Sequence, residues 1–176
     1  MGIQITKRAV DLGIVSNDGD KAVAFYRDVL GFEPEYSVPL PNGGVMHRML
    51  CGDSIFKIMC PDEKSPPLTP TPEHAHFDDA QTVKGLVQRT CALPGIRFIT
   101  IWVSNLREIV DACKAFGSPI VHDVQESRPG VVICVLEDPD GNWIEFVDYT
   151  DASAAKNDLS MKHDRLAGGD STFVQT

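Results

Sequence analysis

Residues 9–16 show a regular alternation of apolar and polar positions near the start of the chain. Leu12 and Ile14 fall on one side of this stretch, and Asp11 and Gly13 fall on the other. The side chains of a strand point alternately to its two faces, so the pattern predicts a half-buried strand. The acidic residue of this strand faces away from the core.

A helical pattern comes next, and three further strands follow it. The apolar residues at helical spacing, which end just before a glycine suited to a helix C-terminus, are Ala22, Phe25, Tyr26, Val29 and Leu30. Strands separated by glycine-containing turns are expected near 32–38, 45–51 and 54–60. Residues 1–61 therefore predict a first β-α-β-β-β module.

The same order of elements returns in the second half of the chain. An alternating segment near 96–103 leads into a helix that is capped by Ser104 or Asn105 and closed by Gly117. Three more strands, again separated by turns, are expected near 119–124, 131–137 and 143–149. Residues 96–149 therefore predict a second β-α-β-β-β module.

Equivalent positions of the two modules keep a nearly constant offset. Gly31 and Gly117, which end the two helices, lie 86 residues apart, and Lys57 and Glu145, on the closing strands, lie 88 residues apart. An offset held this closely indicates an internal duplication.

The remaining segments lack this patterning. Five prolines between residues 61 and 72 make 62–95 an extended linker, with a short helix expected near 82–93. Residues 150–176 contain few large apolar side chains and predict a C-terminal tail.

Composition excludes several classes of function. A net charge of −9 argues against binding to nucleic acid or to an anionic membrane surface. The five cysteines include no Cys-x-x-Cys pair, which favours buried thiols in a reduced, cytoplasmic protein over a disulfide or zinc framework. No apolar run approaches the length that spans a membrane.

The candidate chemistry begins at the turn before the last strand. Pro139 and Gly141 form this turn, and Glu145 then falls on the strand face opposite Ile144 and Phe146. A carboxylate among apolar side chains is costly to bury without a partner. The sequence therefore predicts a polar or charged partner for Glu145.

Two segments carry a resemblance to a known family. Residues 22–32, Ala-Val-Ala-Phe-Tyr-Arg-Asp-Val-Leu-Gly-Phe, and residues 138–146, Asp-Pro-Asp-Gly-Asn-Trp-Ile-Glu-Phe, resemble the vicinal oxygen chelate superfamily. Its members include glyoxalase I, extradiol dioxygenases and the bleomycin- and fosfomycin-resistance proteins. The resemblance covers roughly residues 8–149. It implies an α+β fold of two tandem βαβββ modules, whose curved sheets surround a central cavity that binds a small molecule, and a homodimer.

The resemblance also implies where a metal would bind. Metal-dependent members place one ligand on the first and one on the last strand of each module, and the matching positions here are Asp11, Lys57, Phe98 and Glu145. Asp11 and Glu145 can coordinate a divalent metal, whereas Lys57 and Phe98 cannot. Two of the four usual ligand positions are therefore lost.

Three interpretations remain open. In the first, Lys57 replaces the cation between Asp11 and Glu145, unless the three form only a structural ion pair. In the second, His47, His122 or the His74–His76 pair rebuilds a metal site, although isolated histidines are more often surface residues. In the third, the protein sequesters an apolar ligand without chemistry, and its aromatic residues line the cavity or merely fill it.

The interpretation that we favour is a glyoxalase-like lyase or isomerase acting on a carbonyl or hydroxy-acid substrate. Glu145, Lys57 and Asp11 would be its catalytic residues. The residues expected to bind substrate, because they share the cavity-facing side or lie beside it, are Phe98, Thr100, Trp102, Arg128 and Trp143. The alternative is a metal-free binding or resistance protein. An extradiol oxygenase is disfavoured, because the histidine positions that its iron site needs hold Asp11 and Phe98.

Overall fold

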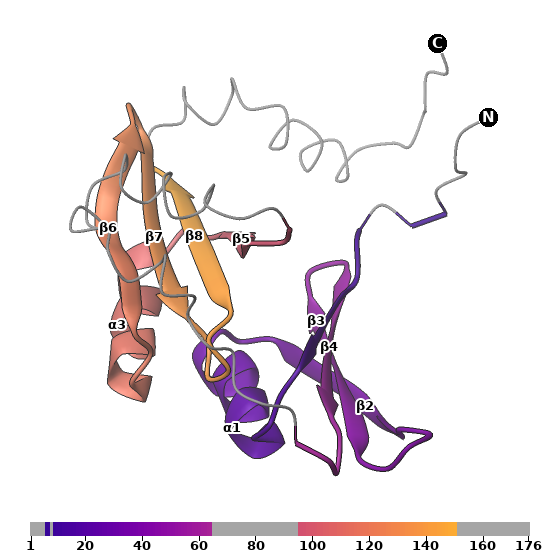
Figure 1. Cartoon of the computed structure of the whole chain (residues 1–176). Helices are drawn as coiled ribbons and strands as arrows, with labels where there is room; N and C mark the ends of the chain where they lie inside the picture. Colours follow the sequence, from indigo (N-terminus) through magenta and orange to yellow (C-terminus); the bar gives the residue numbers. More distant parts are fainter. Residues whose placement is uncertain (1–5, 8, 65–94, 151–176) are drawn as a thin grey trace.

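The computed structural model describes residues 6–7, 9–64 and 95–150 (Figure 1). The first half forms a four-stranded sheet in the order β1-β4-β3-β2. Strand β1 runs parallel to β4, and the other neighbours are antiparallel. The elements are β1 (Leu12–Val15), α1 (Gly19–Ala24), η1 (Phe25–Val29), β2 (Glu33–Pro39), β3 (Val45–Cys51) and β4 (Ser54–Cys60).

The second half repeats this topology in a sheet of the order β5-β8-β7-β6. Strand β5 is parallel to β8, just as β1 is to β4. Its elements are β5 (Phe98–Trp102), α3 (Leu106–Phe116), β6 (Ile120–Arg128), β7 (Val131–Glu137) and β8 (Trp143–Tyr149). The predicted α+β class and the two βαβββ units are confirmed.

Two elements differ from their predicted form. The first helix begins at Gly19, capped by Asp18, and ends as a turn of π-helix in which Leu30 N donates to Phe25 O. Strand β6 runs to Arg128, well past the predicted end near residue 124. Irregularities in its register against β7 bend the strand and let pairing continue to the turn.

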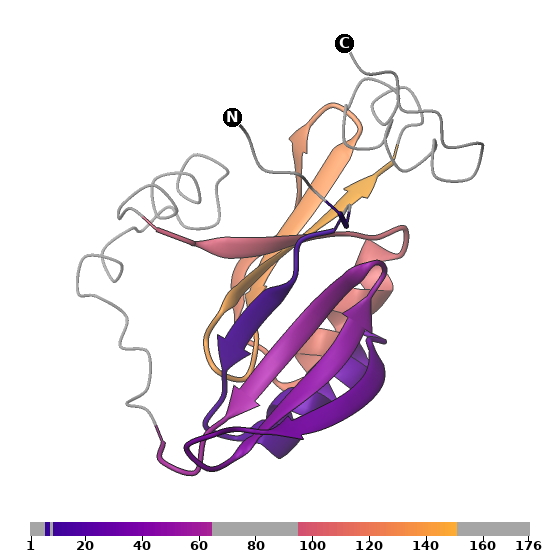
Figure 2. The same ribbon diagram turned by 90° about the vertical axis from the view of Figure 1, so that its right-hand side faces the viewer.

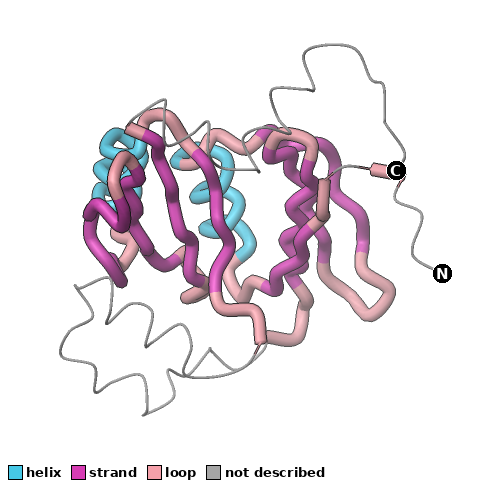
Figure 3. The backbone as a smooth tube through the Cα atoms, turned by 90° about the horizontal axis from the view of Figure 1, so that it is seen from above, coloured by secondary structure: helices cyan, strands magenta, loops and turns pink. Residues whose placement is uncertain are grey.

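The helical segments join the two units in one hydrophobic core. The rings of Phe25 in η1 and Phe116 in α3 lie 5.4 Å apart. Ile58 of the first sheet and Phe146 of the second are both buried in this core. Figures 1 and 3 show the strands in two groups, with α1 at the junction between them. In each unit the sheet face beside the helices is therefore the face that folding buries.

A buried carboxylate also links the two units. Asp138, in the turn between β7 and β8, accepts a hydrogen bond of 2.6 Å from the hydroxyl of Tyr26 in η1. Its other donors are the backbone of Asp140 and both the backbone and the side chain of Asn142. Burial raises the pKa of Asp138, although these hydrogen bonds oppose the change. Burial, together with Asp138, raises the pKa of Tyr26.

Some predictions concern residues outside the described ranges. They are the helix near 82–93, nearly all of the linker, the His74–His76 pair and the tail. Within the described ranges, no helix is long and apolar enough to span a membrane.

Candidate functional site

Each sheet has a second face, turned away from the helices, which we call its helix-distal face. On β5, Ile99 and Ile101 pack against the core, so Phe98, Thr100 and Trp102 occupy the helix-distal face. Phe98 and Trp102 remain 37% and 40% exposed. The predicted alternation therefore holds on β5. Figure 2 looks onto the corresponding helix-distal face of the first sheet, with the helices behind it.

Glu145 lies on the helix-distal face of the second sheet and has a close partner. The hydroxyl of Thr100 donates to Glu145 Oε2 over 2.7 Å. The two residues face each other across the parallel pair β5–β8, whereas Phe98 faces Trp143. Thr100, which the sequence placed among substrate-binding residues, thus orients one oxygen of the half-buried Glu145 carboxylate and leaves the other oxygen without a hydrogen bond from this neighbour.

The surroundings of Glu145 are aromatic and aliphatic. The rings of Trp102 and Tyr149 stack with centroids 4.9 Å apart and an interplanar angle of 11°. Trp143 directs its indole nitrogen to Glu137 Oε1 at 3.3 Å. A cluster of aliphatic side chains packs with Trp143 and Tyr149 and consists of Val121, Val131, Ile133, Val135 and Val147. This face offers a largely apolar surface that carries two acidic groups, Glu145 and, beside Trp143, Glu137.

The helix-distal face of the first sheet is cationic at the equivalent place. Lys57 on β4 pairs with Gly13 of β1 on one side and with Arg48 of β3 on the other. Arg48 Nε donates to Glu35 Oε2 over 3.1 Å, and its guanidinium lies 4.7 Å from the centre of the Tyr36 ring. The sequence singled out Lys57 but not Arg48.

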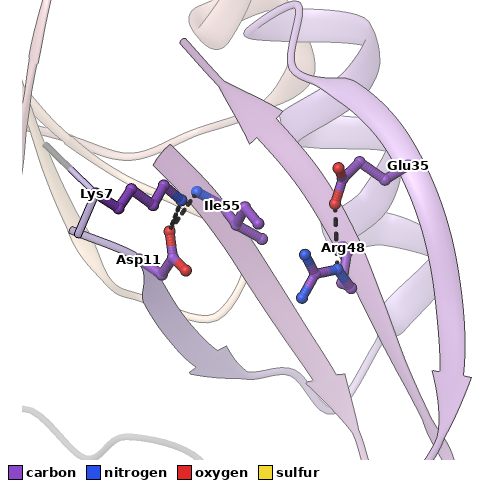
Figure 4. A network of polar contacts seen from close by, with 5 residues as sticks. All are labelled: Lys7, Asp11, Glu35, Arg48 and Ile55. Carbon is purple, nitrogen blue, oxygen red and sulfur yellow. Dashed lines mark hydrogen bonds and ion pairs between the residues drawn. The ribbon is translucent and has the colours of Figure 1, made fainter. Parts of the chain in front are cut away.

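Asp11 is engaged by other groups. Its carboxylate accepts a hydrogen bond from Lys7 and one of 2.9 Å from the backbone of Ile55 (Figure 4). The hydrogen bond from Lys7, followed by that from Ile55, lowers the pKa of Asp11, and the charge of Lys57 adds to the effect. In the described ranges Lys57 forms no ion pair with Asp11 or Glu145. The predicted triad is therefore not assembled as an ion pair.

The two described histidines lie on different faces of their sheets, His47 on the helix side and His122 on the helix-distal side. His47 pairs with Ile58 of the core and hydrogen-bonds Ser37 at 2.9 Å, so it lies on the helix side of its sheet. It cannot join Asp11 and Lys57 on the other face, which corrects its candidacy as a substitute ligand there. His122 is buried and pairs with Val135, the neighbour of Glu145. Two strand spacings separate His122 from Glu145, about 10 Å.

These residues do not fit a divalent metal. No three His, Cys, Asp or Glu side chains gather in a metal-binding arrangement in the part of the chain that the structure describes. One oxygen of each carboxylate is already engaged, that of Asp11 by Lys7 and Ile55 and that of Glu145 by Thr100. A metal on Glu145 and Asp11 stays a prediction, and no step below depends on one.

Two further features complete the geometry. Arg128, predicted to bind substrate, is exposed and pairs with Val131 at the end of β6. A groove of about 570 Å³ lies elsewhere, and the residues that line it are Val15, Leu40, Pro41, Asn42, Gly43, Pro61, Glu63 and Lys64. None of the predicted site residues lines that groove.

Known proteins match this chain in sequence pattern and fold. The family model described as the Glyoxalase/Bleomycin resistance protein/Dioxygenase superfamily matches residues 8–146. No curated protein matches the chain at a significant level.

Solved structures share the fold at low sequence identity. A glyoxalase family protein from Bacillus cereus aligns with a TM-score of 0.63 and 14% identity, over 85% of this chain and 97% of its own. Glyoxalase I from Leishmania major aligns with a TM-score of 0.60 and 17% identity, over 91% and 99%. The fosfomycin resistance protein FosX from Mesorhizobium loti aligns with a TM-score of 0.52 and 14% identity, over 93% and 99%. At these identities the likeness shows the fold alone.

Proposed function

The chain belongs to the Glyoxalase/Bleomycin resistance protein/Dioxygenase superfamily, and we propose that it is a glyoxalase-like enzyme, a lyase or isomerase of small carbonyl or hydroxy-acid substrates. In this proposal the helix-distal faces of the two sheets line one substrate site, within a chain or between the two chains of a homodimer. Superfamily membership supports small-molecule chemistry in general but does not select the substrate.

One observation carries the proposal: Glu145 stands on an apolar face with one oxygen held by Thr100. A carboxylate that is fixed in orientation and has a free oxygen can remove or return a proton beside a substrate carbonyl. Its aromatic neighbours, including Trp102, would pack against the carbon skeleton and exclude water. Glu145 is therefore the proposed proton-transferring residue.

The cationic face supplies the complementary element of the proposal. Removing a proton beside a carbonyl develops negative charge on the carbonyl oxygen, and a fixed cation stabilises that charge. Lys57 occupies the position in the first sheet that Glu145 occupies in the second. Asp11, which lies near Lys57 and lowers the net charge there, is assigned a supporting electrostatic role.

Turnover of a substrate panel tests this function. Purified protein and the Glu145→Gln variant would be assayed against 2-oxoaldehydes, acyl thioesters and hydroxy acids, with elemental analysis of both samples. Glu108→Gln is a matched control, because Glu108 lies on the outside of α3 and bonds only Asn105 among the interactions described. The proposal expects turnover that survives in the control and is lost with Glu145→Gln. Stoichiometric metal that disappears with Glu145→Gln would contradict the assignment of Lys57 as the cation of the site.

A binding protein without chemistry is the second candidate. The exposed Phe98 and the stacked Trp102–Tyr149 pair favour it, because together they present a flat aromatic surface to a ligand. Tryptophan fluorescence quenched by an apolar ligand that is recovered unconverted would support this candidate over the enzyme.

A further inference from the structure

Arg48 and Lys57 form an unusual pair on the helix-distal face of the first sheet. They are direct partners across the antiparallel strands β3 and β4. Cβ atoms of such partners lie about 5 Å apart, and two like charges in that relation destabilise a sheet. A pair of cations at this spacing therefore favours a counter-anion between them.

The charges inside the protein compensate this pair only in part. Glu35 accepts a bond from Arg48 Nε, which leaves both terminal nitrogens of the guanidinium without a hydrogen bond among the described residues. Figure 4 shows these nitrogens on the side away from Glu35, toward β4. Asp11 lies near enough for Lys57 to affect its pKa, but its partners are Lys7 and Ile55.

The guanidinium is also held in place before any ligand binds. Glu35 fixes its Nε edge, and the ring of Tyr36 lies 4.7 Å from its central carbon. The Arg48 side chain is only 18% exposed. A planar fork that is already oriented loses little conformational entropy when it binds an oxyanion, and it favours a group with two coplanar oxygens.

The strand beside Lys57 leaves room for a ligand. The partner of Lys57 on β1 is Gly13, which has no side chain to cover the lysine. A Cβ atom placed there would meet only the end of Met59, at 3.5 Å. The neighbouring rows on this face are apolar, Ile55 with Leu50 and Met59 with Met46. An anion would thus meet two cations in surroundings that strengthen their attraction.

We propose that Arg48 and Lys57 form a binding site for one oxyanion group, a carboxylate or a phosphate, of the protein's small-molecule ligand. This inference rests on the proposed function and adds Arg48 to it: the oxyanion group would lie beside the reacting carbonyl, so that Lys57 contacts both this group and the carbonyl oxygen while Glu145 faces the reacting carbon. It implies that the substrates are acids or phosphate esters, and that neutral carbonyl compounds bind weakly.

Nuclear magnetic resonance titration at low ionic strength tests the site directly. The probes are oxalate, inorganic phosphate, and oxamide as the neutral analogue of oxalate. The inference expects oxalate or phosphate to shift the amide signals of Gly13, Arg48 and Lys57 saturably. The anion that binds with the higher affinity shows whether the site takes a carboxylate or a phosphate. Oxamide should cause no such shift. The inference is wrong if neither anion shifts these signals saturably, or if oxamide shifts them equally.

Variants then assign the binding to the two side chains. Arg48→Met and Lys57→Met keep the apolar stems and remove the charges. Each should weaken anion binding at least tenfold, because each removes roughly one charge-assisted hydrogen bond. Lys57→Arg should retain most of the binding because it keeps the charge, and if a methionine variant fails to fold, the comparison of oxalate with oxamide on the wild type decides the matter. Lys114→Met is the control, since Lys114 pairs with Asp123 on the exposed side of the other unit. Equal affinity in all four variants would overturn the inference.

The two proposals fail separately. Anion binding that depends on Arg48 and Lys57, without turnover of any panel substrate, would leave the oxyanion site standing and remove the enzyme assignment. Turnover that depends on Glu145, with anion affinity unchanged by Lys57→Met, would leave the enzyme and remove the oxyanion site.

Discussion

The two helix-distal faces share one topology and carry opposite charges at equivalent positions. Lys57 and Glu145 occupy equivalent places on the last strands, and their parallel partners Gly13 and Thr100 are equivalent as well. The cation lies next to Arg48, whereas the carboxylate lies next to Val135. The duplication thus preserved the backbone register while the chemistry of the exposed side diverged. Faces that differ in this way are suited to hold the two ends of one polar ligand.

The faces toward the helices differ much less. Ile58 in the first sheet and Phe146 in the second are both buried in a single apolar core. Packing constrains such positions, because a change of even one methylene group in a close-packed core alters stability. We therefore assign stability to the faces that pack against the helices, which are alike in the two units, and function to the helix-distal faces, which differ.

Glu145→Gln should have the largest effect of any single change on the second face. Removing a positioned general base costs about 10²–10⁴-fold in rate, so turnover of the active panel substrate should fall by that order. The side chain is half-buried and glutamine can still accept from Thr100, so the urea unfolding midpoint should hardly change. Wild-type turnover in this variant would show that the acidic face is not the reactive one.

Lys57→Met should have the next largest effect, because it removes the charge that most clearly distinguishes the two faces. We expect kcat/KM to fall about tenfold to a hundredfold, equivalent to about 1.4–2.8 kcal/mol. Lys57→Arg should recover much of the loss, since it restores the charge at the same register position. A loss that arginine fails to restore, in a variant of normal stability, would contradict an electrostatic role.

Tyr26→Phe should weaken the framework that holds both faces. It removes the donor to Asp138 from the other unit, and the loss of a bond to a buried charged group costs about 1.5–3 kcal/mol. Urea denaturation monitored by tryptophan fluorescence measures this change in the free energy of unfolding. Tyr36→Phe is the matched control, because Tyr36 is 58% exposed. Equal stability of the two variants would show that the hydrogen bond from Tyr26 to Asp138 does not contribute to stability.

Asp138 should give the smallest effect, seen as a pH dependence. Its pKa in the folded protein lies above the ordinary value of 3.8, so the folded state binds the proton more tightly than the unfolded state. The stability that Asp138 contributes is then greatest below pH 3.8 and declines as pH rises through its folded pKa. Relative to Asp138→Asn, the wild type should therefore gain stability as the solution is acidified through this range. A relative loss on acidification would mean that the hydrogen bonds outweigh burial.

Local patterns in the sequence were sufficient to predict the order of the elements, and the family resemblance implied how the sheets are arranged. Strand alternation, helical spacing and glycine turns each act over a few residues, and together they predicted both four-stranded units. The two-residue turn Gly52-Asp53 even determines that Arg48 opposes Lys57, because a tight hairpin sets its own register. Arg48 could therefore have been predicted as part of the site, although it was missed.

Other features depend on contacts that no local pattern encodes. The bond from Tyr26 to Asp138 spans 112 residues. Thr100 meets Glu145 across a parallel pair, whose register no hairpin turn sets. The ion pair of Asp11 with Lys7 removes Asp11 from the expected triad, and it depends on how the chain enters β1. The assignment of catalytic and substrate-binding residues accordingly stays a prediction.

A double-mutant cycle between Lys57 and Glu145 tests most directly whether the two faces form one site. The kcat/KM of the wild type, Lys57→Met, Glu145→Gln and the double variant would be compared on the substrate that the panel identifies. Residues that act on one ligand should be coupled by about 0.5–3 kcal/mol, so the double variant should lose less than the product of the single losses. Effects that multiply, which means free energies that add to within about 0.5 kcal/mol, would show that the faces work independently and would contradict a shared site.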